Sequence, residues 1–302
     1  MSKHCFGCLL AAVFSVLSIS AAHAQIFVVN ESGNNSIGEY TTSGATVNAS
    51  LVTGLYFPAD LVLSGSDLFV VNSTSYNTLG EYTTSGATVN ASLVTGLHNP
   101  AGLAVSGSDL FVANYASNTI GEYTTSGATV NASLVSTGSG SNPEGIAISG
   151  NDLFVVNNGN NTIGEYTTSG ATVNASLLTG LDGPQYIAVS GADLFVVNLG
   201  TKTIGEYTTS GGTVNASLIT GLVDPFGIAV SGSDLFVSNL SNGTIGEYTT
   251  SGTTVNTSLV TGLDNPVGLT VEAVPEPSTW VLLLGGLGLP VFCWLRKRRA
   301  RG

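Results

Sequence analysis

Residues 25–272 contain no cysteine, and the three cysteines of the 302-residue chain (Cys5, Cys8 and Cys293) lie outside this segment. A disulfide, a thiolate metal site and a cysteine nucleophile are therefore excluded there. His98 is the only histidine of the segment, so the imidazole ligands of a zinc site are missing as well. A catalytic serine–histidine pair would have to use His98, and an isolated loop histidine is more often simply solvated.

Basic residues are almost absent from the same segment. Its only lysine or arginine is Lys202, against 18 of the chain's 19 carboxylates, which gives a net charge of −17. Proteins bind nucleic acid by neutralising phosphates with Lys and Arg, so we expect no nucleic-acid partner. Cations and neutral or basic partners stay open.

What the segment does have is a repeat. The phrase Gly-Glu-Tyr-Thr-Thr-Ser-Gly begins at Gly38, Gly80, Gly121, Gly164, Gly205 and Gly246. A fixed period of this size indicates a repeat architecture. Each unit is expected to hold four strands, clearest at 102–105, 109–112, 119–123 and 129–134. The first two are continuously apolar and the fourth alternates, so we expect burial to fall from the first strand to the fourth.

The two ends of the segment complement each other. It begins at 26–29 with a strand of the second type and ends at 267–271 with a strand of the first type. Three strands at one end and one at the other complete a sixth unit, as a ring closed through its ends requires. Closure also removes exposed sheet edges. The sequence therefore predicts an all-β six-bladed β-propeller over 25–272; a right-handed β-solenoid is the alternative.

The unit resembles a known propeller repeat. Its elements Pro-x-Gly-Ile-Ala-Val, Asp-Leu-Phe-Val-x-Asn and Asn-Thr-Ile-Gly-Glu-Tyr are similar to the NHL-type repeat and to gluconolactonase-like propellers. The third strand opens with Thr or Ser where the NHL repeat commonly has a basic residue, which weakens the analogy to RNA-binding members. The usual Asp after the second strand is also replaced, by Asn72, Asn114, Asn157, Asn198 and Asn239.

Both termini carry targeting features. Residues 1–24 have the pattern of a secretory signal peptide, with Lys3, a short apolar stretch and the small-x-small pattern Ala22-His23-Ala24. At the other end we expect a Pro-Glu-Pro linker over 273–279, a transmembrane helix over 280–295 and a basic cytoplasmic tail over 296–302.

The C-terminal pattern over 274–301 is similar to the PEP-CTERM sorting signal. The residues that carry the resemblance are Pro275, Glu276, Pro277, Arg296, Lys297, Arg298 and Arg299. The resemblance implies export across the inner membrane, transient anchoring in it, and processing by an exosortase-type enzyme. Delivery to the cell surface or the exterior of a Gram-negative bacterium that makes exopolysaccharide would follow.

Differences between the units suggest a binding face. The first-to-second and third-to-fourth turns are nearly invariant, whereas the other two connections vary, and up-and-down connectivity puts both variable sets on one face. Loops on a rigid scaffold commonly hold binding residues. The alternative explanation is that tight turns tolerate fewer sequence changes than loops do. The candidate ligand-face residues are Asp60, Tyr76, Tyr115, Glu144, Tyr186 and Phe226.

A cation could bind in two places. The gluconolactonase resemblance implies a central divalent ion, with calcium the candidate, held by Asp60, Glu144, Asn198 and Asn239. The glutamates of the repeated phrase lie one blade apart, too far to share one ion, and are more simply a repeated strand position. They are Glu39, Glu81, Glu122, Glu165, Glu206 and Glu247.

Two functions from different classes remain. The favoured one is an exported, monomeric, non-enzymatic binding or structural propeller of the cell envelope, associated with extracellular polysaccharide, with no catalytic residue and no required cofactor. The alternative is a calcium-dependent lactonase or lyase on the same scaffold. A propeller fold alone assigns neither activity.

Overall fold

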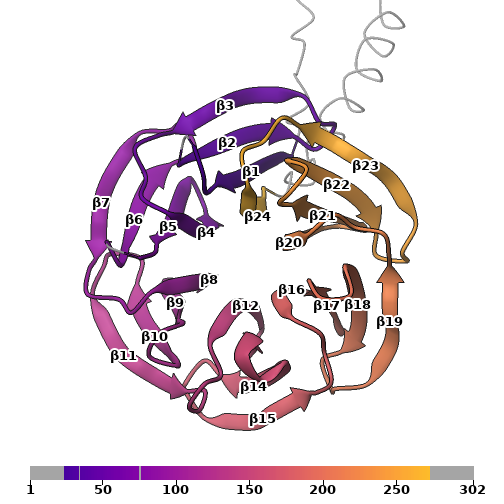
Figure 1. Ribbon diagram of the computed structural model, residues 1–302. Helices are drawn as coiled ribbons and strands as arrows, with labels where there is room; N and C mark the ends of the chain where they lie inside the picture. The colour runs from indigo at the N-terminus through magenta and orange to yellow at the C-terminus, as the bar shows by residue number, and fades with distance from the viewer. Residues whose placement is uncertain (1–23, 34, 75, 273–302) are drawn as a thin grey trace, which may run out of the picture.

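The computed structural model describes residues 24–33, 35–74 and 76–272. In these residues, 24 strands form six antiparallel sheets of four strands, arranged as blades around a central axis (Figure 1). The only helix among them is the short 3-10 helix η1 (Asn158–Asn160), and no described helix has the length and apolar character needed to cross a membrane. The predicted signal peptide (apart from Ala24), linker, transmembrane helix and basic tail lie outside the described residues.

Each blade contains one strand of each predicted type. The inner strands are β4 (Pro58–Ser64), β8 (Pro100–Ser106), β12 (Pro143–Ser149), β16 (Pro184–Ser190), β20 (Pro225–Ser231) and β24 (Pro266–Val271). The second strands are β1 (Gln25–Asn30), β5 (Asp67–Asn72), β9 (Asp109–Asn114), β13 (Asp152–Asn157), β17 (Asp193–Asn198) and β21 (Asp234–Asn239). The third strands are β2 (Ser36–Thr41), β6 (Thr78–Thr83), β10 (Thr119–Thr124), β14 (Thr162–Thr167), β18 (Thr203–Thr208) and β22 (Thr244–Thr249). The outer strands are β3 (Thr46–Val52), β7 (Thr88–Val94), β11 (Thr129–Ser136), β15 (Thr172–Leu178), β19 (Thr213–Ile219) and β23 (Thr254–Thr261).

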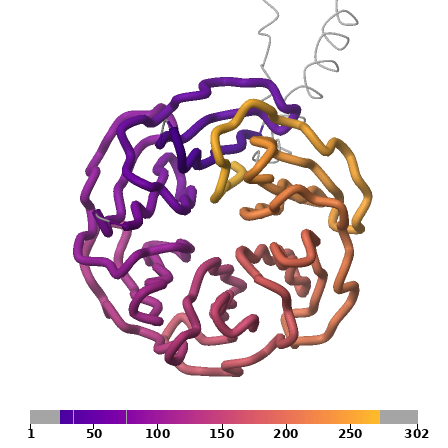
Figure 2. Tube along the Cα trace, viewed as in Figure 1, coloured from indigo at the N-terminus to yellow at the C-terminus, as the bar shows by residue number. Residues whose placement is uncertain are grey.

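The ring closes through one composite blade. Its strand order is β24-β1-β2-β3, with Val271 opposite Ile26 and Leu269 opposite Val28. The two ends of the coloured tube meet in this blade (Figure 2). The predicted six-bladed propeller is thus confirmed, and the solenoid alternative is wrong.

Burial is greatest in the second strands, not in the inner ones, so this part of the prediction is wrong. Phe111 in β9 is 1% exposed, because a neighbouring blade covers each face of its sheet. The inner strands border the axial channel and are less completely covered. Val130 in β11 is 53% exposed, although strict alternation predicted one buried face for this outer strand.

The repeated phrase has a structural explanation. A Cβ added to Gly121 would lie 2.8 Å from ring atoms of Tyr123, so the tyrosine ring lies over the glycine. Gly127 adopts a φ of +86°, which favours glycine, and its backbone packs against Leu93 of the preceding blade. The phrase therefore shapes the third strand, its turn and the contact with the preceding blade.

The Asn-Ala-Ser triplets of the outer strands also have a local role. The Oδ1 atom of Asn131 accepts a hydrogen bond from the amide of Ser133 at 3.1 Å. At this point the register between β10 and β11 shifts, as in a bulge. This side-chain bond replaces a strand contact and accounts for the triplet as strand chemistry.

Candidate functional site

The antiparallel blades give the ring two different faces. The second-to-third and fourth-to-first connections lie together on one face, which we call the loop face, and the other connections lie on the opposite turn face. Every inner strand begins with its proline at the loop face. The chain enters at Gln25 and leaves after Val271 at the turn face, where the amide of Glu272 donates to the carbonyl of Gln25 at 2.8 Å. Both termini of the propeller therefore leave from the turn face.

Near the loop face, the inner strands approach each other closely. The third residue of the inner strand is glycine in four blades, and a Cβ added to Gly102 would lie 2.0 Å from the carbonyl oxygen of Glu144. A Cβ on Gly268 would lie 2.3 Å from the Oδ1 atom of Asp60. The two exceptions, Asp60 and Tyr186, therefore place side chains at this end of the channel from the third position of their strands.

Asp60 joins two neighbouring inner strands. Its Oδ1 accepts a hydrogen bond from the amide of Leu61 in β4, and its Oδ2 accepts one from the amide of Leu103 in β8, each at 2.9 Å. The side chain is buried. Both carboxylate oxygens are therefore already used to hold blades together.

Tyr186 crosses the axis. It lies on β16, which is three blades from β4 around the ring and so faces it. Its hydroxyl is shared between the carbonyl oxygens of Ala59 (3.2 Å) and Ala101 (3.0 Å). Its ring packs against Phe226, with centroids 5.4 Å apart. Tyr186 thus closes the loop-face end of the channel.

An axial cavity lies against this closure. It has a volume of about 220 Å³ and is lined by residues of all six inner strands, with Leu103 alone from β8. Most of the lining residues are aliphatic, and the polar ones are Asp60, Tyr186 and Thr270. The hydrogen bonds of Asp60 and Tyr186 hold the inner strands together at this end.

The carboxyl groups at the closed end have unusual acidities. Burial raises the pKa of Asp60 to about 8, against the two amide hydrogen bonds, which lower it. Burial also raises the pKa of Glu144 to about 8, and the enclosed Oε2 atom of Glu144 has no hydrogen-bond partner among the described residues. The pKa of Tyr186 is raised first by burial and then by Asp60, Glu144 and Glu31.

These shifts predict a propeller that is more stable in mild acid. A carboxyl group whose pKa is higher in the folded state contributes stability that is complete below its unfolded pKa and is lost as pH rises through the folded pKa. For Glu144 this window runs from 4.5 to about 8. The free energy of unfolding should fall by about 1.4 kcal/mol per pH unit for each such group within its window. Chemical denaturation between pH 5 and pH 8 measures this slope.

The matched variant is Glu144→Gln, which keeps the shape and removes the charge. It should be more stable than the wild type at pH 8 and similar at pH 5, with a shallower slope. Glu165→Gln is the control, because Glu165 is only partly covered. Its pKa is also raised, by burial and then by Asp152. Equal slopes in wild type and Glu144→Gln would contradict the assignment.

The four residues expected to hold a central ion do not share contacts. The Oδ1 atom of Asn239 accepts a hydrogen bond from the amide of Val223 at 3.4 Å, and Asn198 donates to the carbonyl of Val196 at 3.4 Å. Asn239 and Asp60 thus use their oxygens on backbone amides, whereas the buried Oδ1 atom of Asn198 has no hydrogen-bond partner among the described residues. Calcium takes six to eight oxygen ligands, and the described residues contain no group of three or more acidic, histidine or cysteine side chains suited to a metal. The arrangement does not fit a calcium cage.

Five of the six repeated glutamates lie beside the aspartate that opens the second strand of their blade, and the exception, Glu39, has Glu272 as its acidic neighbour. The pKa of Glu122, for example, is raised by burial and then by Asp109 of the same blade. Both line a hollow of about 430 Å³ between two blades, together with Thr168 and Ser169 of the next blade. Each glutamate therefore belongs to its own blade boundary, in keeping with a repeated strand position.

The remaining ligand-face candidates lie apart from the channel. Tyr76 stacks on Tyr56, with ring centroids 3.9 Å apart and an angle of 21° between the ring planes. The two rings are 51% and 49% exposed, and the adjacent Phe57 is 50% exposed. Tyr115 lies half-buried on the loop of the next blade. The structure therefore divides the six candidates between the channel end, this aromatic pair, and Tyr115.

Sequence reasoning missed Tyr56, Phe57 and Glu31 as members of these sites. The signal for the first two was present, because Tyr56-Phe57 stands where the next blade has His98-Asn99. The stacking of Tyr56 on Tyr76, twenty positions later, was not visible in the sequence, since it depends on how two loops meet.

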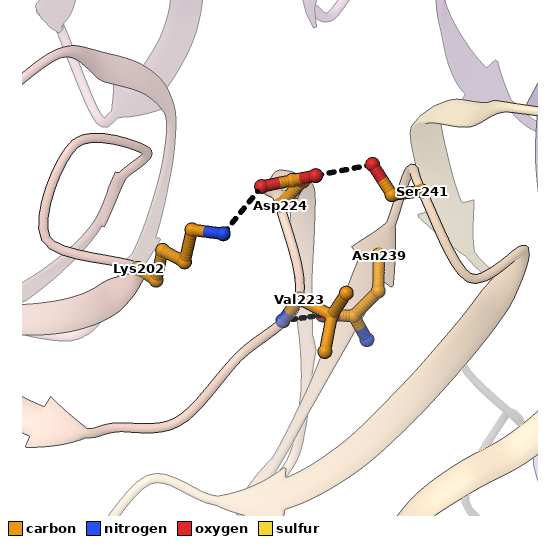
Figure 3. A network of polar contacts seen from close by, with 5 residues as sticks. All are labelled: Lys202, Val223, Asp224, Asn239 and Ser241. Atoms are coloured by element: carbon orange, nitrogen blue, oxygen red, sulfur yellow. Dashed lines mark hydrogen bonds and ion pairs between the residues drawn. The ribbon is translucent and has the colours of Figure 1, made fainter.

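The single lysine of the propeller is already paired. Lys202 forms an ion pair with Asp224 at 2.9 Å, and Ser241 donates to the same carboxylate (Figure 3). The hydrogen bond from Ser241, and then Lys202, lowers the pKa of Asp224. At the equivalent place in another blade, Asn118 accepts the amide of Asn142 at 2.9 Å. The pair therefore replaces a loop-to-loop hydrogen bond and is not arranged as an anion site.

Comparison with known proteins places these observations in a family. The model of the virginiamycin B lyase family matches residues 14–285, and the PEP-CTERM protein-sorting motif matches residues 273–299. Comparison with curated proteins found no match. The sorting motif shows that the protein is exported, is anchored in the membrane in transit to the surface or exterior, and is sorted by an exosortase.

Solved structures share the fold. The nidogen/laminin complex contains a chain with a TM-score of 0.70 and 14% identity, covering 84% of this chain and 100% of its own length. Selenomethionine-substituted virginiamycin B lyase from Staphylococcus aureus has a TM-score of 0.62 and 23% identity, covering 81% of this chain and 84% of its own. A catalytically inactive variant of that lyase with quinupristin has a TM-score of 0.59 and 22% identity, covering 80% and 86%. At these identities, the solved structures show a shared fold alone. The family model, in contrast, matches most of the sequence, and the chain therefore belongs to the virginiamycin B lyase family.

Proposed function

We propose that this protein is a non-enzymatic, carbohydrate-binding propeller of the cell surface, associated with extracellular polysaccharide. The observation that carries the proposal is the exposed Tyr56–Tyr76 stack on the loop face. Aromatic side chains combine an apolar face with a polar edge. A sugar ring has the complementary pattern, with apolar C–H faces and polar hydroxyls around its rim.

The surroundings of the stack favour a neutral sugar. The pair borders a pocket of about 140 Å³ whose lining includes Asn72, Thr78 and Ser92 and no charged residue. Amide and hydroxyl groups of this kind can hydrogen-bond sugar hydroxyls. The net charge of −17 over the propeller disfavours acidic polymers.

The direction of the termini supports binding at the loop face. The chain leaves the propeller after Val271 at the turn face. A propeller held through its C-terminal segment therefore turns the loop face, with Tyr76, away from the membrane. A surface polymer would meet this face first. Since the closed ring needs no second chain to complete a blade, we propose that the protein is a monomer in dilute solution.

The engaged state of the channel-end groups supports a non-enzymatic role. The polar side-chain atoms of Asp60 and Tyr186 are hydrogen-bonded to backbone groups. The compared lyase is inactive as a histidine-to-alanine variant. In this propeller the only histidine is His98, whose side chain is exposed on a loop. A histidine-dependent lyase reaction has no other candidate here.

A lactonase or lyase activity is the second candidate, and one observation favours it. Glu144 has a pKa of about 8 and an enclosed, unpartnered Oε2 atom. Perturbed acidities of this kind are common at catalytic sites. An enzyme of this type would use Glu144 as a proton donor or acceptor at the channel end.

Binding of neutral polysaccharide to residues 25–272 tests the proposal. Tyr76→Ala should weaken binding at least about tenfold, which corresponds to about 1.4 kcal/mol, because it removes one of the two stacked rings. Affinity electrophoresis or calorimetry with neutral and acidic polymers measures the change. Tyr115→Ala is the matched control, since Tyr115 is a half-buried tyrosine on the same face outside the stack, and it should bind like the wild type.

Two results would count against the proposal. The first is equal binding by wild type and Tyr76→Ala. The second is turnover of a lactone, or of quinupristin, the compound bound by the compared lyase, that Glu144→Gln abolishes, since that would establish the enzyme alternative. Melting with and without millimolar calcium distinguishes a metal-dependent form of that alternative from a metal-independent one.

A further inference from the structure

The circumference of the ring is an uninterrupted series of exposed outer strands. Each begins with five exposed residues in succession. We call these five-residue stretches, from the first Thr to the Ser of each outer strand, the rim. They are residues 46–50, 88–92, 129–133, 172–176, 213–217 and 254–258.

The rim is one of two nearly constant parts of the exposed surface, the other being the Thr-Thr-Ser-Gly turn. Its sequence is Thr-Val-Asn-Ala-Ser in five blades and Thr-Val-Asn-Thr-Ser in the sixth. The inner strands arose by the same duplications as the rim, but their sequences differ much more between blades than the rim sequences do. Their second residue is Ala59, Ala101, Glu144, Gln185, Phe226 or Val267. Recent duplication alone does not explain why exposed positions stayed alike while channel positions changed.

Folding explains only part of this constancy. Asn131 is needed for its side-chain bond to the amide of Ser133. Val130 has no comparable reason, because its side chain is 53% exposed. The corresponding valines of the other blades are 50–54% exposed. An outward valine at six equivalent places adds nothing evident to the stability of a single ring.

The rim is also free of charge. None of its residues is acidic or basic, although the propeller carries a net charge of −17. Two copies that approach face to face therefore bring carboxylates together, whereas two copies that approach rim to rim do not. Each rim strand is the unpaired edge of its sheet. Natural edges are commonly protected by charges or bulges, and here only the bulge is present.

The direction of the outer strands suits pairing between copies in one orientation. All six run around the ring in the same rotational sense (Figure 1). Consider two such rings side by side in one plane, with their loop faces on the same side. At the point of contact, the outer strand of one ring runs antiparallel to the outer strand of the other. Antiparallel edges can continue one sheet into the other. Copies anchored through the turn face on one membrane would meet in this orientation.

We propose that the rim binds the rim of a second copy of this chain, so that anchored or crowded propellers associate side by side with their loop faces pointing the same way. Each contact joins two four-stranded blades into one eight-stranded sheet and covers facing valines such as Val130. The equivalent edges around the ring allow several neighbours, and the product is a single layer. Individual contacts are weak because the bulge shortens the regular edge, so association depends on local concentration.

The test compares two variants of equal charge in residues 25–272, all of whose strands pair within that range. The rim variant carries Val→Glu at positions 47, 89, 130, 173, 214 and 255. The control carries Glu at the exposed turn-face positions Ser43, Ser66, Ser108, Asn151, Ala192 and Ser233. Sedimentation equilibrium at protein concentrations up to about 1 mM, a range suited to weak contacts, measures mass. Energy transfer between labelled copies tethered by their C-termini to a bilayer measures association in the native orientation.

Wild type and the turn-face control should associate alike, and the rim variant should stay monomeric, with at least about a tenfold weaker dimer constant. Circular dichroism and melting confirm that both variants are folded. A wild type that is monomeric in solution and shows no more energy transfer than the rim variant would overturn the proposal. So would a rim variant that associates normally but loses polysaccharide binding, because the rim would then be a glycan surface. Loss of sugar binding in Tyr76→Ala leaves this result unaffected, so the two proposals fail separately.

Discussion

A chain that ends at Asn265, just before β24, should lose cooperative folding of the propeller. β24 completes the blade of β1 to β3 and packs between β20 and β4. Its removal exposes the edge of β1 and deletes Val267 and Leu269, which are 2% and 6% exposed. Burial of two such side chains contributes about 4 kcal/mol, to which the lost strand pairing adds. This is a large part of the roughly 5–15 kcal/mol that stabilises a typical protein.

Far-UV circular dichroism and thermal melting measure the effect. The matched control ends at Glu272 and keeps β24, so both proteins lack the C-terminal sorting signal. A second control moves residues 266–271 in front of Gln25 through a Ser-Gly-Ser turn like those of the other blades; it should fold again because the blade is complete. If the protein ending at Asn265 melted like the one ending at Glu272, the ring would not depend on its closure.

Of all substitutions that add a single methyl group to the propeller, Gly102→Ala should lower its stability the most. The added Cβ would lie 2.0 Å from the backbone oxygen of Glu144, and a backbone atom cannot move aside as a flexible side chain can. The neighbouring inner strand would have to shift at the point where Asp60 and Tyr186 hold the ring closed. We expect a loss of about 3 kcal/mol, at the upper end for overpacking, and a fall in Tm of about 10 °C.

Gly212→Ala supplies the matched control. Gly212 directly follows the Thr-Thr-Ser-Gly of residues 208–211, at a position where the other blades have Ala or Thr. The atom nearest to a Cβ added there is the Oγ1 of Thr208, at 3.0 Å. In another blade the amide of Ala128 donates to the Oγ1 atom of Thr124 as the amide of Gly212 donates to Thr208, so alanine fits this turn. This variant should be neutral or more stable by about 0.5 kcal/mol. A Gly102→Ala protein as stable as Gly212→Ala would show that the inner strands are not in close contact.

Several features were predictable because they depend on local pattern and on counting. The repeated phrase set the number of blades, and the incomplete units at the two ends predicted the pairing of β24 with β1. The variable connections were correctly assigned to one face, since antiparallel strands of this length alternate direction. Pro100 and its equivalents, which begin the repeated Pro-x-Gly-Ile-Ala-Val element, open the inner strands.

Other features could not be predicted because they depend on distances across the ring. Tyr186 reaches carbonyl groups of β4 and β8 from the opposite blade, and no spacing in the sequence reports the width of the channel. The asparagines Asn198 and Asn239 looked like possible partners of Asp60, but they bond beside their own strands. Burial of the second strands exceeds that of the inner strands because the channel itself takes the place of a neighbour.

By itself, the sequence determined the blade count, the closure and the exclusion of thiol and zinc chemistry, because these follow from which residues are present and how often they recur. Only the tertiary structure decided that Asp60 and Tyr186 close the channel, that Tyr56 and Tyr76 meet, and that the rim valines face outward. Those outcomes depend on how the inner strands converge and how the sheets twist from axis to circumference. The repeat period of the sequence gives neither the convergence of the strands nor the twist of the sheets.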